Sequence, residues 1–592
     1  MIAPRTDTTT RTKIDYDTRK ARFVIDAPPW LIAHCRNLPN RRWQSSTKVW
    51  TAPAIRANAD FLRRSAEAMR ATFSRAAQDK IDEVLARTHE RHQTGNFPTT
   101  YVFKTKPFAK QREALDALYG KRSMALFMEM GCGKTFVTVN IHAALCVDHH
   151  CDTVVLLCPL SIRNNWVRQL GLHMPDFVRY SMHLLNNGKA GVRAYDQWLK
   201  ESVDHDQRWL VIGIESIAAS RTALDLAEKF ICSSTKSACI VDESHKIKND
   251  SADRTRAAYR LARKSEWRTI MTGTPIANNP LDLYSQYEFL DPDIIGLGDF
   301  YSFRARYAIM GGYENREVLG FNHMDELTEL VAPYTFQATK AEVLDLPPKL
   351  YERREVELTD EQRRLYNAMA RDKVVVTDDK QLTAQNVLEK MLRLAEIVGG
   401  FVSYENEQPT DALGRKQKRS YREPVLGKNP KVAEMLEIAQ ASNQSTIVWC
   451  AYLDELHAVV AALKKAGHTC VALHGGLDET QRTAALDAFQ ANKVRFLVSN
   501  AATGGLGLDM TAGTLEVFFS NTFSYTDRIQ AEDRAHRAGQ TKRVTIVDLI
   551  AVGTVDQAIE AALRAKMDIA DYIRQQINAA HDVGGLLGST HT

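Results

Sequence analysis

The stretch FMEMGCGKTFVT, residues 127–138, decides how the sequence around it is interpreted. It ends as a phosphate-binding loop does, in Gly133, Lys134 and Thr135, but Met128 stands where the pattern G-x-x-x-x-G-K-[ST] has its first glycine. The apolar run SMALFME precedes the loop, and KTFVTVNIHAALC, with helical periodicity, follows it. A strand, a glycine-rich turn and a helix in this order form the context that a phosphate loop requires, so we predict a nucleotide site rather than an ordinary turn.

In such a loop the main chain does most of the binding, because its N–H groups point at phosphate oxygens from the positive end of a helix. The residues that we expect to supply this cradle are Met130, Gly131, Cys132 and Gly133. Lys134 would reach the β- and γ-phosphates, and the hydroxyl of Thr135 would help to hold Mg²⁺. The predicted cofactors are therefore ATP and Mg²⁺.

Further apolar runs follow in two series, and each run ends in small polar residues. The first series is DTVVLLCP, WLVIGIES, SACIVDES and WRTIMTGTP, and the second is STIVWCAY, TCVALHG, VRFLVSNA, TLEVFFSN and RVTIVDLI. Strands that are apolar throughout are buried on both faces, which is typical of parallel sheets with crossover helices. We predict an α/β fold with two parallel-sheet lobes in tandem, helical insertions, and a small α+β domain at the N-terminus.

The predicted divisions follow changes in composition. Length alone indicates several domains, since 592 residues are too many for one core. RFVID and KVWTA are expected to be strands with a helix over WLIAHCRNL between them, and TGNFPTT breaks the helical pattern near residue 95. The expected segments are a loose N-terminus (1–20), the small domain with a helical linker (21–95), the first lobe (96–335), a helical connector (336–440), the second lobe (441–575) and a loose tail (576–592).

The composition limits the partners and the cellular location that are expected for the chain. The net charge of +5 permits a nucleic-acid partner without demonstrating one. The nine cysteines never form C-x-x-C, so we expect free thiols in a reducing cytosol and neither disulfides nor a zinc site. No apolar run reaches membrane-spanning length, and the N-terminus lacks a secretory signal. We expect a cytoplasmic or nucleoid-associated protein.

Chemistry-bearing residues follow two more strands of the first series. Asp242 and Glu243 come directly after the apolar run ACIV; one could hold Mg²⁺ through water and the other orient the attacking water, although such a pair alone is most often a helix cap. The next run ends in Thr272, Gly273 and Thr274, which either link the phosphate site to a bound nucleic acid or form a plain turn. His245 either couples the two segments or merely packs there.

The second series offers cations. A glycine-rich loop, SNAATGGLGLDMT (499–511), precedes QAEDRAHRAGQ (530–540). Arg534 and Arg537 are three residues apart, which places them on one face of the predicted helix. Two arginines on a helix are ordinarily surface charges, but facing a triphosphate they would neutralise transition-state charge, which is worth roughly 10³–10⁵ in rate.

Taken in order, the motifs resemble those of the superfamily 2 helicases, and among them the Swi/Snf-type DNA translocases, over about residues 100–565. The matching segments are KPFAKQREAL, MEMGCGKT, VLLCPLSIRNNW, VIGIESI, IVDESHKIKN, MTGTPIANNPLDLYS, LPPKLYERREVELTDEQRRLY, TIVWCAY, LHGG, LVSNAATGGLGLDMT, QAEDRAHRAGQ and IVDLIAVGTVDQAI. Members of this family commonly lack the first glycine of the loop, which accounts for Met128. Met128 and Cys132 depart from the family's usual acidic residue and leucine, but neither change removes a phosphate ligand.

The resemblance implies RecA-like lobes and further roles. Gln111 is similar to the family's adenine-reading glutamine, and Gln530 joins Arg534 and Arg537 in an ATP motif of the second lobe. The residues implied to contact DNA are Pro159, Leu160, Ser161, Ser216, Thr272, Gly273, Thr274, Thr503, Gly504 and Gly505. AHRAGQ, where many RNA helicases have G-R-x-G-R, favours the Swi/Snf-type branch, which moves along double-stranded DNA.

The N-terminal unit carries a second resemblance. LIAHCRNLPNRRWQSSTKVWTAP resembles the HARP domain of annealing helicases, with its LP-x-R and paired tryptophans. This implies that Trp43 and Trp50 contact fork or junction DNA; the alternative is that both tryptophans only form the core of a small domain. The compact chain without chromatin-reader modules suits a bacterial or phage protein.

The sequence therefore predicts an ATP-dependent translocase on double-stranded DNA that remodels or reanneals forks. Two alternatives stay open. One is a conventional helicase that separates the strands of DNA or RNA, and the other is a DNA-binding scaffold without a motor. The presence of Lys134, Glu243 and both arginines favours an active enzyme over the scaffold.

Overall fold

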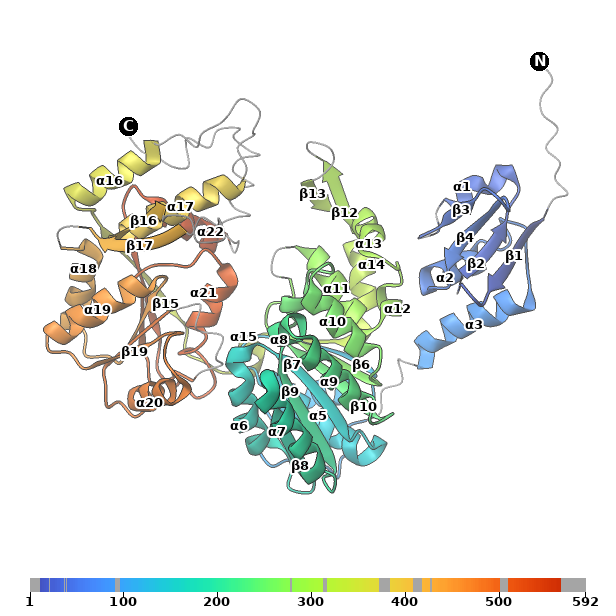
Figure 1. The fold of residues 1–592 in the computed structure, drawn as a ribbon, viewed down its shortest axis with the longest axis horizontal. Helices are drawn as coiled ribbons and strands as arrows, with labels where there is room; N and C mark the ends of the chain where they lie inside the picture. Colours follow the sequence, from blue (N-terminus) through green and yellow to red (C-terminus); the bar gives the residue numbers. More distant parts are fainter. Residues whose placement is uncertain are drawn as a thin grey trace, which may run out of the picture. The chain divides into compact units, whose positions relative to one another are not determined.

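The computed structural model describes residues 11–565 except 21, 37, 39, 91–95, 277–278, 312–316, 372–383, 408–417, 426–427 and 501–508. The chain divides into two compact units, 1–343 and 344–592 (Figure 1). Among the described residues, no helix has the length and apolar character needed to cross a membrane.

The N-terminal part of the first unit is a five-stranded sheet in the order β3-β4-β2-β1-β5. Its elements are β1 (Thr12–Asp17), β2 (Arg22–Asp26), α1 (Ile32–Cys35), β3 (Arg42–Gln44), β4 (Val49–Pro53), α2 (Arg56–Arg64), β5 (Ala71–Phe73) and α3 (Arg75–Glu90). The strands over RFVID and KVWTA are confirmed, with a short helix between them. The prediction of a loose segment over 1–20 is wrong for β1, because Ile14 is buried in the core and the strand pairs with both β2 and β5.

The first lobe is built on a seven-stranded parallel sheet in the order β14-β6-β11-β10-β7-β9-β8. The strands are β6 (Ser123–Met128), β7 (Thr153–Cys158), β8 (Tyr180–Leu184), β9 (Gln207–Gly213), β10 (Ser237–Asp242), β11 (Trp267–Met271) and β14 (Thr335–Ala338). Every residue of β6, β7 and β10 is buried, as expected for strands covered on both faces. The apolar runs of the first series are therefore confirmed as strands of one sheet.

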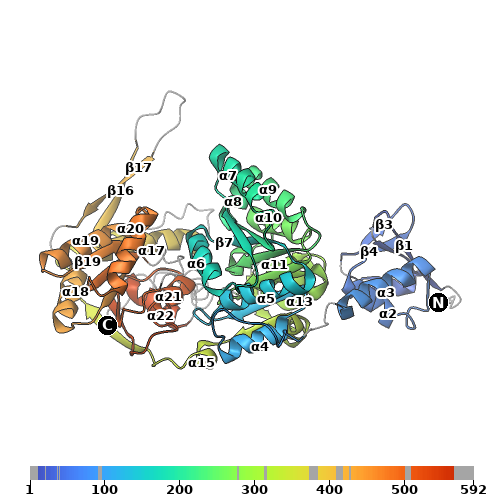
Figure 2. The ribbon, with the colours of Figure 1, turned by 90° about the horizontal axis from the view of Figure 1, so that it is seen from below.

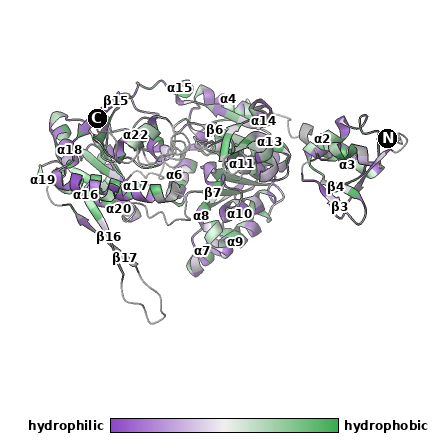
Figure 3. Ribbon diagram, turned by 90° about the horizontal axis from the view of Figure 1, so that it is seen from above, coloured by the Kyte–Doolittle hydropathy of each residue, from purple (hydrophilic) through white to green (hydrophobic). Residues whose placement is uncertain are grey.

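Helices cover both faces of this sheet (Figures 1 and 2) and enclose two separate apolar clusters. They are α4 (Ala109–Leu118), α5 (Lys134–His149), α6 (Arg163–His173), α7 (Gly188–Glu201), α8 (Ile214–Ala219), α9 (Arg221–Ile231), α10 (Asp253–Ala262), α11 (Leu283–Leu290), α12 (Pro292–Ile295), α13 (Phe300–Tyr307), α14 (Met324–Val331) and α15 (Lys340–Val343). Surface helices such as α7 and α9 carry both hydropathy colours in Figure 3, as expected when one face packs on a sheet. An antiparallel hairpin, β12 (Ala308–Gly311) and β13 (Glu317–Phe321), extends this unit.

The second unit has a six-stranded parallel sheet in the order β15-β22-β21-β18-β20-β19. Its strands are β15 (Leu350–Val356), β18 (Thr446–Cys450), β19 (Cys470–Leu473), β20 (Phe496–Asn500), β21 (Leu515–Phe518) and β22 (Thr545–Ala551). Its helices are α16 (Asp360–Arg371), α17 (Ala384–Gly399), α18 (Pro430–Ala441), α19 (Leu453–Lys465), α20 (Glu479–Gln490), α21 (Tyr525–Glu532) and α22 (Val555–Arg564). The predicted α/β class with two RecA-like parallel-sheet lobes is confirmed.

The stretch 336–440 holds more than the helices predicted for it. It supplies β14 to the first sheet, β15 to the edge of the second, and a hairpin of β16 (Phe401–Glu407) and β17 (Lys418–Pro424), which Figure 2 shows side by side. Along the chain, the boundary between the two units falls between residues 343 and 344. β15 escaped prediction because it is an edge strand of charged, mostly exposed residues and lacks the apolar run by which buried strands are recognised.

Candidate active site

The phosphate loop connects β6 to α5 and is shaped by two glycines. Gly131 and Gly133 have φ angles of +83° and +86°, a left-handed conformation that side-chain-bearing residues rarely adopt. A Cβ atom on Gly133 would also lie 2.0 Å from Gln111 Nε2. Both conformation and space therefore require glycine at this position.

Gln111 on α4 is held against this loop. Its side chain is buried, Nε2 donates to the carbonyl of Cys132 at 3.1 Å, and Oε1 accepts from the N–H of Phe108 at 2.9 Å. The structure thus brings the predicted base-reading glutamine into contact with the predicted phosphate cradle. Its role toward adenine stays a prediction.

Met128 and Cys132, the two departures from the family pattern, are buried apolar residues. Met128 is the last residue of β6, and its carbonyl accepts from Lys134 Nζ at 2.8 Å. Cys132 is fully buried and packs in the core of the first lobe. Because the main chain of Met128 makes the contact with Lys134, its side chain packs in the core without disturbing the loop.

The two predicted carboxylates lie at the end of β10 and are buried. Asp242 is 6% exposed; its Oδ2 accepts from the indole N–H of Trp166 at 2.8 Å, and its Oδ1 accepts from the N–H of Glu243 at 2.9 Å. Burial, together with the adjacent Glu243, raises the pKa of Asp242 to about 7. Trp166, the last residue of the segment VLLCPLSIRNNW, lies on α6 and is 1% exposed; no role was predicted for it from the sequence.

Glu243 connects the segment after β10 with the turn after β11. Its Oε2 lies 3.3 Å from His245 Nδ1 and accepts from Thr272 Oγ1 at 3.3 Å, while His245 Nδ1 is 3.2 Å from the same hydroxyl. Burial opposes ionisation here, but the hydrogen bond and charge of His245 and the charge of Lys134 outweigh it and lower the pKa of Glu243. His245 therefore makes the linking contact that was one of its two predicted roles.

The turn after β11 lies against the phosphate loop. A Cβ on Gly273 would be 3.3 Å from the backbone N of Met130, so the two segments touch. Thr272 is fully buried, and its hydroxyl accepts from the N–H of Thr274 at 3.1 Å. A continuous set of contacts therefore runs from the loop through Thr272 to Glu243, which a plain turn would not provide.

Two predicted DNA-contact segments follow β7 and β9, which are neighbours in the sheet. Leu160 is 46% exposed and packs on Gly213, where a Cβ would lie 2.3 Å from Leu160 Cδ2. Ser216 is buried on α8 beside the same glycine. All these segments stand at the carboxyl ends of parallel strands, where ligands of open α/β sheets bind. The structure brings residues 159–161 and 214–216 together.

The residues present fit Mg²⁺. The adjacent carboxylates of Asp242 and Glu243 and the half-buried hydroxyl of Thr135 are hard oxygen donors, and a cation would offset the burial and the repulsion that raise the pKa of Asp242. Within the described ranges, no cluster of three or more His, Cys, Asp or Glu residues could hold a metal. Such a site suits an ion that is bound by one or two carboxylates together with substrate phosphates.

In the second unit, the prediction that Arg534 and Arg537 lie on one helical face is wrong. α21 ends at Glu532, and turns follow. The turns are held by tertiary contacts: His536 Nε2 lies 2.8 Å from the carbonyl of Pro347, and Gln540 Nε2 donates to the carbonyls of Thr511 and Gly513. These side-chain contacts outweigh the helical tendency of the segment.

The arginines differ in exposure. Arg534 is 3% exposed, and its carbonyl accepts from the N–H of Met510 at 3.1 Å. Arg537 is half-buried in the turn, and Gln530 is half-buried on α21. Thr503, Gly504 and Gly505 lie outside the described residues.

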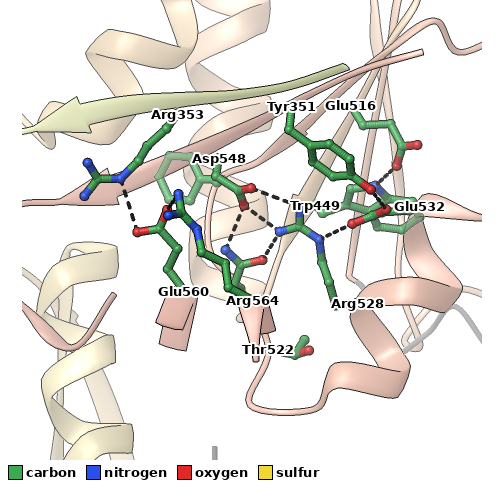
Figure 4. A network of polar contacts seen from close by, with 12 residues as sticks. Tyr351, Arg353, Trp449, Glu516, Thr522, Arg528, Glu532, Asp548, Glu560 and Arg564 are labelled. Carbon is green, nitrogen blue, oxygen red and sulfur yellow. Dashed lines mark hydrogen bonds and ion pairs between the residues drawn. The ribbon is translucent and has the colours of Figure 1, made fainter. Parts of the chain in front are cut away.

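Sequence reasoning also missed a buried ion network in this unit, centred on Arg528 (Figure 4). Arg528 bonds Glu532 Oε1 at 2.8 Å and Asp548 Oδ2 at 3.0 Å, and its guanidinium lies 3.5 Å from the centroid of the Phe518 ring. Glu532 also accepts from Lys349 Nζ at 2.8 Å. The signal available was the i,i+4 spacing of Arg528 and Glu532, which usually marks a surface pair.

The paired tryptophans of the N-terminal unit face each other across the β3–β4 hairpin. Trp43 and Trp50 are partners in register, with ring centroids 5.3 Å apart and planes at 53°. Trp43 is 47% exposed, whereas Trp50 packs against the core with a buried indole N–H. The alternative that both tryptophans serve only as core is therefore wrong for Trp43. Arg42 and Lys48 are exposed beside it.

Comparison with known families identifies both lobes. The SNF2-related domain matches residues 36–399, which is more than half of the chain. The chain belongs to the SNF2-related family. A helicase conserved C-terminal domain matches residues 427–539 in the second unit. The presence of both domains makes this SNF2-related protein a helicase-like ATPase.

Curated relatives of the family are distant and longer. YwqA of Bacillus subtilis is 26% identical over 462 residues, which are 76% of this chain and 46% of YwqA. The human TATA-binding protein-associated factor 172 is 24% identical over 76% of this chain and 27% of its own length. This SNF2-related chain thus spans about half or less of the curated relatives that it matches. A solved structure, the Sulfolobus solfataricus SWI2/SNF2 ATPase core in complex with dsDNA, is 21% identical and covers 84% of this chain and 100% of its own, with a TM-score of 0.37.

Proposed function

We propose that the chain is an ATP-driven translocase that moves along double-stranded DNA. The observation that carries this proposal is the set of contacts through Glu243, His245 and Thr272, because it joins the phosphate loop to a segment implied to touch DNA. Through these contacts, Glu243, which would orient the attacking water, would respond to the binding of DNA. A DNA-binding scaffold without a motor has no need of such a connection.

In this proposal each ATP-site residue has a distinct task. Lys134 leaves the carbonyl of Met128 for the β- and γ-phosphates, Asp242 holds Mg²⁺ through water, and Glu243 orients the attacking water. Mg²⁺, when bound, neutralises charge on the phosphates. The second lobe contributes Arg534 and Arg537 to the developing charge of the transition state.

The proposed polymer is duplex DNA, gripped by its phosphates. Short loops and helix starts at the carboxyl edge of the sheet, at 159–161, 214–216 and 272–274, offer hydroxyls and backbone N–H groups, which contact phosphates without reading bases. Binding should then be independent of sequence and sensitive to salt. A protein that acts on DNA is expected where DNA lies, which supports a cytoplasmic or nucleoid-associated location for a protein of bacterial or phage origin.

The test compares polymers. We expect ATP turnover by the full chain to be stimulated more by duplex DNA than by single-stranded DNA or RNA. A triplex-forming strand should be displaced while a plain duplex stays paired. Efficient separation of a tailed duplex would instead favour a conventional helicase, and stimulation mainly by RNA would exclude the DNA translocase.

We also propose that the N-terminal unit directs the motor to forks or junctions, as the HARP-like pattern implies. The exposed ring of Trp43 supports this, because an unpaired base stacked on it would contribute roughly 1–3 kcal/mol. Trp43→Ala should leave the unfolding temperature and the turnover on plain duplex unchanged while it reduces the preference for forks and the annealing of strands. Trp50→Ala is the matched control, since it removes a ring packed on the core and should lower stability. Equal loss on forked and plain DNA in Trp43→Ala would contradict the role in targeting.

A further inference from the structure

Trp166 contacts the Asp242 carboxylate through a buried side-chain donor. The indole N–H only donates, and here it donates to Oδ2 at 2.8 Å from a ring that is 1% exposed. The other oxygen accepts from the main chain of Glu243 at 2.9 Å. With one fixed donor on each oxygen, the plane of the carboxylate is set, and each oxygen keeps a lone pair for another partner.

The same helix that carries Trp166 begins at a segment implied to touch DNA. Residues 160–162 form a single turn that runs directly into α6, so Trp166 lies within the first turns of the helix. Arg163, its first residue, donates to the carbonyl of Leu185 at 2.9 Å, and the exposed Leu160 packs on Gly213. One short rigid element therefore joins a surface segment to the buried carboxylate.

We infer that Trp166 is a positioning residue that orients Asp242 toward Mg²⁺ and transmits the state of residues 159–161 to it. This inference rests on the proposed metal role of Asp242. Without the indole N–H, of these two donors only the N–H of Glu243 holds the carboxylate, and rotation about its terminal torsion, which has only a broad preference, is less restricted. Partners that orient a metal ligand in this way are typically worth about 10–100-fold in metal affinity.

The link to DNA has a second consequence. If DNA bound at residues 159–161 shifts α6, it changes the apparent affinity for Mg²⁺, and Mg²⁺ must change the affinity for DNA by the same factor. Removal of the indole N–H should weaken both effects together. A tryptophan that serves only as core would alter stability without affecting either factor.

The experiment measures binding of a fluorescent, non-hydrolysable ATP analogue to the full chain while Mg²⁺ is titrated, with and without duplex DNA. In Trp166→Phe we expect the Mg²⁺ midpoint to rise about 10-fold or more, while binding of the analogue in EDTA is unchanged. We also expect DNA to shift this midpoint less than in the unaltered chain. Benzothienylalanine at position 166, which keeps the size of the ring and lacks the N–H, should give the same result even where phenylalanine impairs folding.

Trp209→Phe is the matched control. Trp209 is equally buried, stacks on Trp166 with ring centroids 6.5 Å apart, and donates to Gln207 Oε1 at 2.9 Å rather than to Asp242. Its Mg²⁺ midpoint should not move. Equal shifts in the two variants, or an unchanged effect of DNA in Trp166→Phe, would overturn the inference.

Asp242→Asn tests the proposed metal role of Asp242 separately from the inference about Trp166. A raised Mg²⁺ midpoint in Asp242→Asn supports the metal role, and the tryptophan variants then decide the inference alone. An unchanged midpoint in Asp242→Asn would refute the metal role and the inference with it.

Discussion

Two buried charge clusters, one in each lobe, are built in opposite ways. In the second lobe, Arg528 bonds both Glu532 and Asp548 (Figure 4). Lys349 also bonds Glu532, and the two cations outweigh the effect of burial, so the pKa of Glu532 is lowered. In the first, Asp242 and Glu243 stand side by side, and the pKa of Asp242 is raised to about 7. The Arg528 cluster sets each buried carboxylate against a cation, whereas two adjacent carboxylates at a strand end suit a place prepared for a cation.

The largest effect is expected from removal of the lysine of the phosphate loop. Lys134→Ala should nearly abolish ATP turnover, because the β- and γ-phosphates lose their positive partner. Lys121→Ala is a matched control, since Lys121 also donates to a main-chain carbonyl of the first unit, that of Pro333. Steady-state ATPase assays with duplex DNA check this, and normal turnover in Lys134→Ala would mean that GCGKT is not the nucleotide site.

The Arg528 network of the second lobe should respond in stability rather than in chemistry. Arg528→Met leaves Glu532 and Asp548 without their shared cation and should lower the free energy of unfolding by about 3–5 kcal/mol. Arg353→Met breaks the more exposed pair with Glu560 and should cost about 1 kcal/mol or less. Denaturant unfolding measures both, and a similar small cost in the two variants would show that the buried network is not needed for stability.

The last effect concerns pH. Because the folded-state pKa of Asp242 is raised, the folded chain holds a proton that the unfolded chain loses above about pH 4. Stability in metal-free buffer should therefore fall as pH rises from about 4 to about 7, and Asp242→Asn should lack this part of the decline. Thermal unfolding of the unaltered chain and of Asp242→Asn across this pH range measures the difference. Parallel pH profiles of the two would show that Asp242 has no raised pKa in the folded chain.

Much of the first site was predictable because its residues follow buried strands. Asp242, Glu243 and Thr272 each come after an apolar run, and parallel strands bring their carboxyl ends to one edge of the sheet. The contact between Trp166 and Asp242 was not predictable, because it joins residues 76 apart in the sequence through a side-chain direction that no periodicity reveals. The helical expectation for Arg534 and Arg537 failed for a related reason, since tertiary hydrogen bonds of His536 and Gln540 end the helix.

The contact between Gly133 and Gln111 has a consequence for how this enzyme can vary. A methyl group at residue 133 would force a disfavoured backbone angle and would also push the Gln111 amide away from the loop, so one substitution there would disturb both the loop and the glutamine. The hydrogen bond from Gln111 to the carbonyl of Cys132 connects α4 to the loop. If Gln111 reads the base as predicted, this contact would tie recognition of the base to the shape of the phosphate loop.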